Sequence, residues 1–180
     1  TLPNMTVINP ADAKEAEAAV LAAIDYQGPV YIRLGRAETK DIHDDSYHFE
    51  WGKAEGLRQG SDVSIFATGI MTAKALDAAE TLAKRGIQAE VINVHTIKPL
   101  DEETVIASAK KTGKVVTAEE HSIIGGLGSA VAEVLARQCP TKQAFVGVQD
   151  SFGESGSPDD LLEKYGLTAE AIVKAAVGLQ

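Results

Sequence analysis

Residues 63–94 read VSIFATGIMTAKALDAAETLAKRGIQAEVINV, and this stretch decides the fold. It contains two short apolar runs, Val63 to Ala67 and Ala89 to Val94, whose length and composition predict strands. Between them, Thr72 to Arg85 carries apolar residues at helical spacing, and Gly86 follows where the helix is predicted to end. A strand, a helix and a second strand in this order predict a parallel crossover unit.

The same alternation continues to the end of the chain. Val115 to Ala118 and Ala144 to Val148 are two further apolar runs of strand length. Further helices are predicted from Asp101 to Lys111, from Ser129 to Gln138, from Pro158 toward Gly166 after a cap at Ser157, and from Ala169 to Val177 after a cap at Thr168. The alternation therefore predicts an α/β fold with three layers, in which helices cover both faces of a mainly parallel sheet.

The first part of the chain predicts the end of a separate α/β unit. Residues 9–12, Asn-Pro-Ala-Asp, are typical of a helix start, with Asn9 as the cap and Pro10 at the first helical position. The predicted helix continues from Ala16 to Tyr26, and the apolar run from Val30 to Leu34 follows as a short strand. One helix and one strand do not make a domain, so we assign them to the remnant of a neighbouring one.

A polar stretch separates this remnant from the predicted sheet. Residues 37–60 are rich in Asp, His and Glu, which indicates a connecting arm, and a hairpin from His48 to Arg58 is compatible with its pattern. We therefore divide the chain into an N-terminal segment at residues 1–42, a linker at residues 43–60 and a C-terminal domain at residues 61–180.

Composition and charge exclude several classes of protein. The chain has 44% hydrophobic and 24% charged residues, as ordinary soluble proteins do, and it contains no apolar stretch of membrane-spanning length. Its formal net charge of -9 would repel the phosphates of nucleic acids. A lone Cys139 predicts neither an internal disulfide nor a zinc site, and the opening residues do not read as a signal peptide. We expect a cytoplasmic protein without nucleic-acid or membrane partners.

The strongest local candidate for a site is residues 119–129, EEHSIIGGLGS, where a strand is predicted to end and a helix to begin. Glycines at such a position let backbone N–H groups approach an anion. The spacing, however, matches neither the dinucleotide fingerprint nor the P-loop, and the two acidic residues would repel phosphate. A tight turn packed against a partner is therefore favoured over a phosphate site. The residues assigned to this turn or interface are Glu119, His121, Gly125, Gly126 and Gly128.

The other polar candidates are weaker. His121 beside two carboxylates has the composition of a general base, but no nucleophile or second metal-spaced His accompanies it, so a role in the turn is favoured. Residues 95–101, HTIKPLD, are interpreted as architecture, and Gly69 alone is a weak signal for an anion site. Arg33 and Arg36 lie at a predicted strand end, where binding of an anionic ligand and pairing with a neighbouring acid are equally expected. We predict no catalytic residue and no metal ligand in the chain.

Taken together, these segments resemble the C-terminal portion of transketolase and its relatives. Residues 5–36 are similar to the last helix and strand of the family's pyrimidine-binding domain. Landmarks similar to those of its C-terminal domain follow at residues 60–69, 91–101, 119–131 and 152–168. Each match alone is weak, but all of them occur in the family's order and cover nearly the whole chain.

The resemblance implies that the complete protein transfers a two-carbon ketol unit between sugar phosphates, with thiamine diphosphate and Mg²⁺, in the pentose phosphate pathway. This chain lacks the Gly-Asp-Gly and Asn motif that the family uses for the metal and the diphosphate, so we expect it to bind no cofactor and to be inactive alone. Arg36 matches an arginine that grips the sugar phosphate in the family, and its planar fork suits that role. The rest is expected to supply scaffold and contacts to an N-terminal subunit or domains, and to a second copy in a homodimer.

Alternatives stay open. Deoxyxylulose-phosphate synthase and the beta subunit of 2-oxoacid dehydrogenases share the architecture that the resemblance implies. Two alternatives come from other classes of protein. One is a non-catalytic α/β module that binds a nucleotide or an effector, and the other is a pure oligomerisation domain. The missing nucleotide fingerprint argues against the module.

Overall fold

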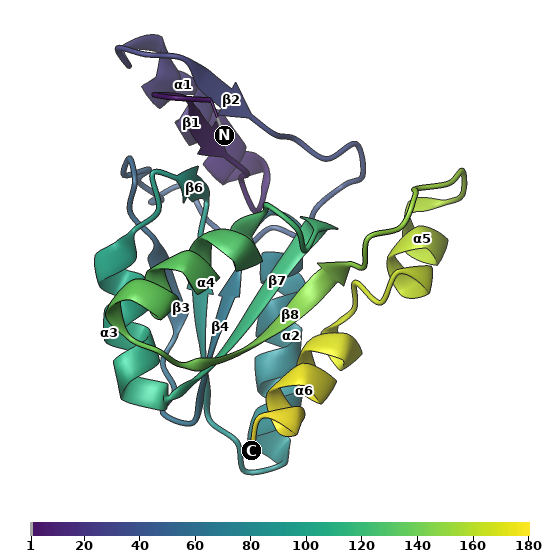
Figure 1. Ribbon diagram of the computed structural model, residues 1–180. Coiled ribbons are helices and arrows are strands. Elements are labelled where there is room, and N and C mark those ends of the chain that lie inside the picture. The colour runs from purple at the N-terminus through teal and green to yellow at the C-terminus, as the bar shows by residue number, and fades with distance from the viewer. Residues whose placement is uncertain (1) are drawn as a thin grey trace.

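The computed structural model describes residues 2–180 (Figure 1). A five-stranded sheet with the order β3-β5-β4-β7-β8 forms its centre. Its strands are β3 (Glu55–Arg58), β4 (Val63–Ala67), β5 (Ala89–Asn93), β7 (Lys114–Ser122) and β8 (Lys142–Val148). β4 pairs in parallel with β5 and β7, β7 pairs in parallel with β8, and only β3 runs antiparallel to its neighbour. The predicted, mainly parallel sheet is confirmed.

Helices cover both faces of this sheet, as Figure 1 shows. α2 (Met71–Lys84) and α6 (Ala169–Gly178) lie on one face, whereas α3 (Glu102–Thr112) and α4 (Leu127–Gln138) lie on the other. Because side chains alternate along a strand, Ile65 of β4 packs with the first pair of helices and Phe66 with the second. Within residues 2–180, no helix is long and apolar enough to cross a membrane.

Local capping signals explain most helix boundaries. Asp101, Ser157 and Thr168 each accept a hydrogen bond from a backbone N–H of the first turn that follows, as predicted. They begin α3, α5 (Pro158–Lys164) and α6 respectively. α4 begins at Leu127, two residues earlier than predicted, because the carboxylate of Glu119 accepts hydrogen bonds from the N–H groups of Leu127 and Gly128.

The N-terminal segment contains more structure than its pattern predicts. β1 (Thr6–Ile8), α1 (Ala13–Ile24) and β2 (Val30–Ile32) follow each other, and β1 pairs in parallel with β2. β1 also pairs, antiparallel, with β6 (Thr96–Lys98), which completes a three-stranded sheet with the order β2-β1-β6. The sequence predicts neither β1 nor β6, since a strand of three residues is too short to show an alternation of apolar and polar residues. The segment is thus attached to the C-terminal domain by strand pairing.

The predicted cap of α1 is wrong. Asp12 caps the helix, with Oδ1 accepting a hydrogen bond of 2.9 Å from the N–H of Glu15. Asn9 lies outside the helix because its main chain is bonded elsewhere: its N–H donates to His95 and its carbonyl accepts from Gly69. Contacts between distant parts of the chain therefore override the local Asn-Pro signal.

The linker forms no hairpin of its own. Of residues 48–58, only β3 is a strand, and it pairs with β5 rather than with another part of the linker. The preceding aromatic residues pack across the junction with the N-terminal segment: Trp51 stacks on Tyr26 with ring centroids 4.3 Å apart, and Phe49 lies 4.5 Å from the ring of His95. Burial of these rings holds the linker against both neighbours. The boundaries drawn at residues 42 and 60 stay predictions.

Candidate functional site

The carboxyl ends of β4 and β7 form the crevice where an open parallel sheet usually binds a ligand, because the strand order reverses between them. In this protein Asn9 of the N-terminal segment enters that crevice, which still holds a cavity of about 480 Å³ with Asn9, Arg33 and Glu119 in its lining. The carbonyl of Asn9 accepts hydrogen bonds from the N–H of Gly69, at 3.3 Å, and from Oγ1 of Thr68, at 3.2 Å. A Cβ atom on Gly69 would lie 2.7 Å from Nδ2 of Asn9. Gly69 therefore serves the close approach of Asn9 rather than that of an anion.

The glycine turn between β7 and α4 is closed by a carboxylate of the chain itself. Glu119 is only 2% exposed, and its oxygens accept hydrogen bonds from the backbone N–H groups of Leu127, at 2.7 Å, and Gly128, at 2.8 Å. Burial raises the pKa of Glu119, while these two N–H groups act in the opposite direction. Glu119 thus occupies the place at the α4 N-terminus where a phosphate would bind.

The other residues of the turn have distinct positions. A Cβ atom on Gly126 would lie 2.0 Å from Oε2 of Glu119, and one on Gly128 would lie 2.5 Å from the ring of Phe145. The N–H of Gly125 donates to Oγ of Ser129 at 2.9 Å. His121 is exposed, and its Nδ1 lies 2.9 Å from the carbonyl oxygen of Ser122. Glu119 is nearby but uses its oxygens on the N–H groups of α4, so it does not orient the imidazole as the acid beside a general base does, and an interface role for the turn stays a prediction.

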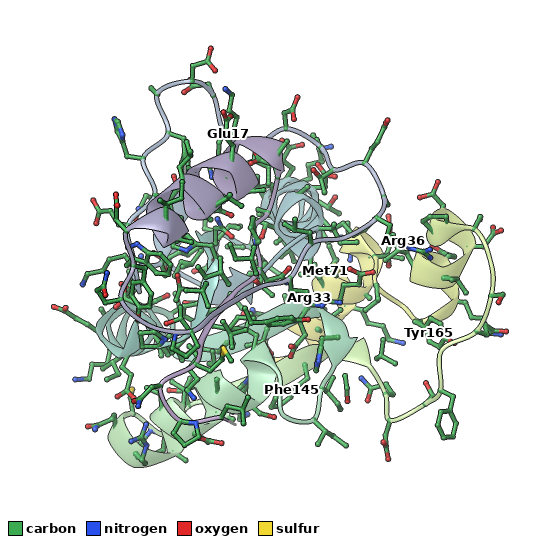
Figure 2. All side chains as sticks on the ribbon, turned by 90° about the horizontal axis from the view of Figure 1, so that it is seen from above. Glu17, Arg33, Arg36, Met71, Phe145 and Tyr165 are labelled. Atoms are coloured by element: carbon green, nitrogen blue, oxygen red, sulfur yellow. The ribbon has the colours of Figure 1, made fainter. Side chains whose placement is uncertain are left out.

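The two arginines after β2 have different surroundings. Arg33 is half-buried, and its Nη2 donates to the main-chain carbonyl of Glu120 at 2.7 Å, with the carboxylate of the same residue at 3.8 Å. Arg36 is exposed and lines a cavity of about 330 Å³ together with Ile70, Glu120 and Tyr165. In Figure 2, Arg36 lies on the side of the molecule that carries Tyr165, and Arg33 lies nearer the centre. Both arginines line a cavity, but Arg33 is paired within the chain whereas Arg36 is exposed.

A buried charged cluster, which the sequence analysis missed, joins α1 to the linker. The side chain of His43 is 4% exposed and lies between two carboxylates, with Nδ1 3.0 Å from Asp12 and Nε2 2.8 Å from Glu55. Burial by itself lowers the pKa of His43, but the hydrogen bonds with Glu55 and Asp12 and the nearby charges of Glu15 and Asp12 raise it to about 9. The imidazolium form therefore neutralises part of the negative charge that the cluster buries.

Glu15 lies at the centre of this cluster and is fully buried. Its Oε2 accepts a hydrogen bond of 2.7 Å from the N–H of Ala11. Its Oε1 accepts hydrogen bonds from the hydroxyl of Tyr47, at 2.6 Å, and from Nδ2 of Asn93, at 2.8 Å. α1, the linker and β5 are thus joined through one carboxylate. The only signal in the sequence is an acidic residue inside an alanine-rich helix, which is more often exposed.

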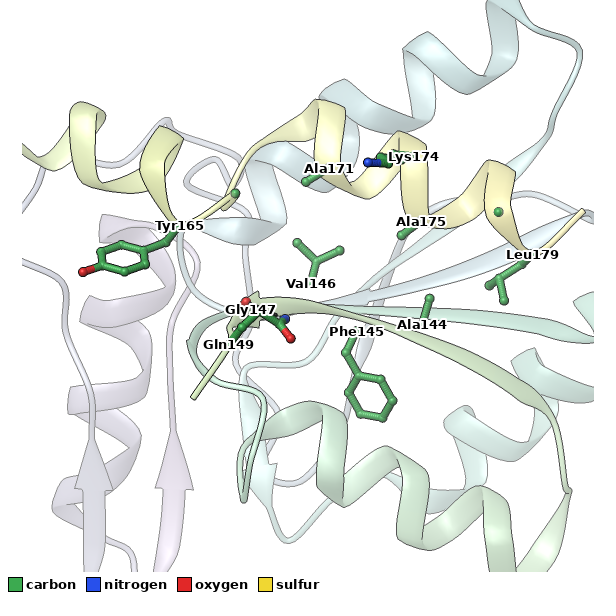
Figure 3. A pocket seen from close by; sticks show the side chains of 12 residues that line it. Ala144, Phe145, Val146, Gly147, Gln149, Tyr165, Ala171, Lys174, Ala175 and Leu179 are labelled. Atoms are coloured by element: carbon green, nitrogen blue, oxygen red, sulfur yellow. Dashed lines mark hydrogen bonds between the residues drawn. The ribbon is translucent and has the colours of Figure 1, made fainter. Parts of the chain in front are cut away.

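A further cavity, of about 440 Å³, lies between β8 and α6 (Figure 3). The side chains of Val146, Ala171 and Ala175 face the space between strand and helix, whereas Phe145 points to the other face of the sheet. Lys174 is the one charged residue in its lining. With no cluster of nucleophilic or acidic groups, this cavity offers no chemistry.

Family models match the chain in two consecutive parts. The pyrimidine-binding domain of transketolase matches residues 1–41, and the transketolase C-terminal domain matches residues 52–172. The chain belongs to the transketolase family. The five-stranded sheet and its helices are accordingly those of the transketolase C-terminal domain, and the N-terminal segment corresponds to part of the pyrimidine-binding domain.

Individual relatives agree with this assignment. The 6-deoxy-6-sulfo-D-fructose transketolase subunit of Clostridium sp. (strain MSTE9) is 56% identical over 97% of this chain and 54% of its own length. The solved inactive beta4 tetramer of a split-gene transketolase is 52% identical, with a TM-score of 0.97 over 99% of this chain and 59% of that one. A 1-deoxy-D-xylulose-5-phosphate synthase from Desulforudis audaxviator is 38% identical over 97% of this chain, but only 28% of its own length is covered. The chain thus spans about half the length of the transketolase relatives.

The buried cluster does not have the properties of the transketolase metal site. Among residues 2–180, Glu15, His43 and Glu55 form the one group whose ligand atoms lie close enough together to hold a metal ion, within 4.8 Å of one another. Each of these side chains already bonds to protein groups, and Mg²⁺ prefers oxygen ligands to imidazole. The cluster is therefore a structural network.

Changing Gly126 to alanine is expected to lower the free energy of unfolding by about 2 kcal/mol, because the Cβ atom would displace Glu119 from two backbone N–H groups. Urea denaturation measures the difference. Gly153→Ala is the matched control: a Cβ there meets no atom within 4 Å, so stability should change by less than about 0.5 kcal/mol. Equal losses in both variants would contradict the role assigned to Glu119.

Stability is expected to fall as the pH rises from the ordinary pKa of His43, 6.5, to its value in the folded protein, about 9. A raised pKa means that the folded state holds the proton more tightly, so the stabilisation is complete below 6.5 and is lost through 9. Allowing for the partial exposure of Glu55, the loss is on the order of 2 kcal/mol. Urea denaturation at several pH values tests this, and in His43→Gln the decline should disappear. A wild-type curve parallel to that of the variant would refute it.

Proposed function

We propose that this chain is the C-terminal part of an enzyme that transfers a two-carbon ketol unit between phosphorylated sugars. The observation that carries the proposal is the order of the two family matches, with part of a pyrimidine-binding domain followed by a transketolase C-terminal domain. In the family, thiamine diphosphate supplies the electron sink for this chemistry when it is bound. We infer that this half supplies scaffold, contacts and one substrate-binding side chain, and is inactive alone.

The residues of this chain do not fit thiamine diphosphate and Mg²⁺. A diphosphate would need free backbone N–H groups at a helix N-terminus. Glu119 takes those of α4, and the carbonyl of Asn9 takes the N–H of Gly69 in front of α2. The buried carboxylates near His43 would repel the diphosphate. We therefore infer that other parts of the complete protein hold the cofactor and its metal.

Arg36 is the side chain that we assign to the substrate. It is exposed, and it follows the strand that the segment shares with the family's pyrimidine-binding domain. Its cavity, at about 330 Å³, has room for a small anion, and the two carboxylates in the lining, Glu120 and Glu154, are paired with Arg33 and Lys164. A guanidinium binds the oxygens of a phosphate through two parallel hydrogen bonds, which fixes the orientation of the sugar as well as its charge.

A sulfonated sugar is a second candidate substrate. The relative from Clostridium sp. is, by its name, a 6-deoxy-6-sulfo-D-fructose transketolase subunit, and it shares 56% of its residues with this chain over the matched region. A sulfonate carries a negative charge and three acceptor oxygens, so Arg36 can bind it in the same way as a phosphate. We infer that the anionic end of the donor is either of these groups.

Assembly with further subunits is part of the proposal. Val20, Leu21 and Ile24 form an exposed apolar face on α1, and β2 is an edge strand of the small sheet. Because apolar faces and open strand edges favour pairing, we infer that the N-terminal half of the enzyme covers them. We further propose a homodimer of the complete enzyme, in the cytoplasm and in the pentose phosphate pathway.

An assay of the complete or reconstituted enzyme tests the function. With thiamine diphosphate and Mg²⁺ added, it should convert xylulose 5-phosphate plus ribose 5-phosphate, or use 6-deoxy-6-sulfo-D-fructose as the donor. The 180-residue chain alone should give no product. Activity only with pyruvate as the donor would favour the deoxyxylulose-phosphate synthase or 2-oxoacid dehydrogenase alternatives and would reject ketol transfer.

A further inference from the structure

Arg33 is placed to hold the loop that carries Arg36. The N–H of Arg33 donates to the carbonyl of Ile8 at 2.8 Å, which extends the pairing of β1 and β2 by one residue. Beyond that bond, none of the backbone hydrogen bonds described for residues 2–180 involves residues 34–39. The side chain of Arg33 is therefore the last anchor of the chain before Arg36.

The anchor point is a fixed part of the large sheet. The guanidinium of Arg33 donates to the carbonyl of Glu120, which lies in β7 where the register with β8 shifts between Ala118 and Ser122. Such an irregularity leaves main-chain groups without a partner in the neighbouring strand. A charged donor on a carbonyl makes one of the stronger hydrogen bonds in proteins. The side chain of Arg33 is also only 31% exposed, which limits competition from water.

Glu120 connects this anchor to the cavity of Arg36. It accepts the hydrogen bond from Arg33, and it also lines the cavity into which Arg36 faces, beside Ile70. One residue of β7 thus borders both arginines. A shift of Arg33 relative to Glu120 would move the start of the loop, and with it the guanidinium of Arg36 relative to its cavity.

We propose that Arg33 is a positioning residue for substrate binding: it anchors the loop after β2 on Glu120 so that Arg36 faces the anionic end of the sugar. The inference rests on the proposed function, because it gives Arg33 a role only through Arg36. It predicts that the two arginines are not independent. Removing Arg33 should weaken anion binding when Arg36 is present and should have no further effect when Arg36 is absent.

Steady-state kinetics of the complete enzyme test this with Arg33→Met, Arg36→Ala and the double variant. Arg33→Met should raise KM for phosphorylated sugars about tenfold and change kcat less than about twofold, since one charge-assisted hydrogen bond is lost. KM for an unphosphorylated acceptor such as glycolaldehyde should stay within about twofold. The double variant should match Arg36→Ala alone. Inorganic phosphate, used as a competitive inhibitor, should lose affinity in the same order.

Further variants keep the test decisive. Arg33→Lys retains the positive charge without the planar guanidinium and should give an intermediate rise in KM. It serves as the test if Arg33→Met folds poorly. Arg85→Met removes an exposed arginine at the end of α2 and should leave all constants unchanged. Effects of Arg33 and Arg36 that multiply in the double variant would overturn the inference. If Arg36→Ala itself did not discriminate phosphorylated from unphosphorylated sugars, the proposed substrate contact would be rejected instead.

Discussion

Replacing Glu15 by alanine is expected to lower the free energy of unfolding by about 4 kcal/mol, the largest loss of stability expected here. The carboxylate is fully buried and accepts three hydrogen bonds, from Ala11, Tyr47 and Asn93. Its removal leaves two buried donors and the part-buried hydroxyl of Tyr47 without an acceptor, and each then loses the interaction with water that the unfolded chain provides. The loss is large because it affects α1, the linker and β5 together.

The single tryptophan gives this prediction a local measurement. Trp51 belongs to the linker and stacks on Tyr26, just after α1, at 4.3 Å between ring centroids. Its fluorescence therefore reports whether the linker and the N-terminal segment are in contact. In urea denaturation followed by Trp51 fluorescence, the midpoint should lie at a lower urea concentration for Glu15→Ala than for the wild type. Far-UV circular dichroism should follow it, or lag behind if the C-terminal domain unfolds separately.

Glu17→Ala provides the matched control on the same helix. Glu17 has an exposed side chain and lies 3.7 Å from Lys14, whose side chain is also exposed, so its loss should change stability by less than about 0.5 kcal/mol. Similar midpoints for the two variants would mean that the buried network contributes nothing specific. The hydrogen bonds of Glu15 would then be replaced by water in the variant.

The sequence was sufficient for the four mutually parallel strands of the large sheet because their signals are local, whereas β3 lies in the stretch assigned to the linker. Apolar runs such as Val63 to Ala67 are long enough to show a strand, and a cap such as Asp101 bonds within the turn that it begins. These contacts join residues only a few positions apart. The order of strands and helices therefore follows from the sequence without knowledge of tertiary contacts.

The N-terminal segment was predicted less well because its structure depends on distant partners. β1 pairs Val7 with Lys98, and Asn9 is bonded to His95 and Gly69. No property of three consecutive residues identifies a partner ninety positions away. The assigned cap at Asn9 was wrong for the same reason, since a long-range contact competes with the local one.

In the candidate site, too, the local features were predicted and the long-range contacts were not. That the glycines of residues 119–129 form a turn is a local property, but the group that closes it was not identified. From the sequence, Glu119 and Glu120 are expected to repel phosphate, whereas in the structure the carboxylate of Glu119 itself takes the place of an anion at α4. Likewise Arg33 and Arg36 look equivalent in the sequence. Only the hydrogen bond to Glu120, which is 87 residues away from Arg33, distinguishes the anchored arginine from the exposed one.

Arg36→Ala in the complete enzyme is expected to lower kcat/KM for phosphorylated sugars by about 100-fold, almost entirely through KM. The guanidinium is exposed before substrate binds, so binding must offset its desolvation, and two charge-assisted hydrogen bonds to one anion leave a net factor of about this size. Because the anionic end of the sugar lies away from the reacting carbonyl, the contact is equally strong in the ground state and the transition state. It therefore affects binding rather than turnover.

Steady-state kinetics with matched substrates separate this role from a general loss of structure. For an unphosphorylated acceptor, Arg36→Ala should stay within about threefold of the wild type, and Arg36→Lys should recover part of the affinity for phosphate but not its bidentate geometry. Circular dichroism should be unchanged, since the side chain is exposed. An equal loss for phosphorylated and unphosphorylated sugars would remove Arg36 from the anion site. A loss confined to the charged substrates assigns this chain a direct part in choosing the sugar, although we propose that the cofactor is held elsewhere in the enzyme.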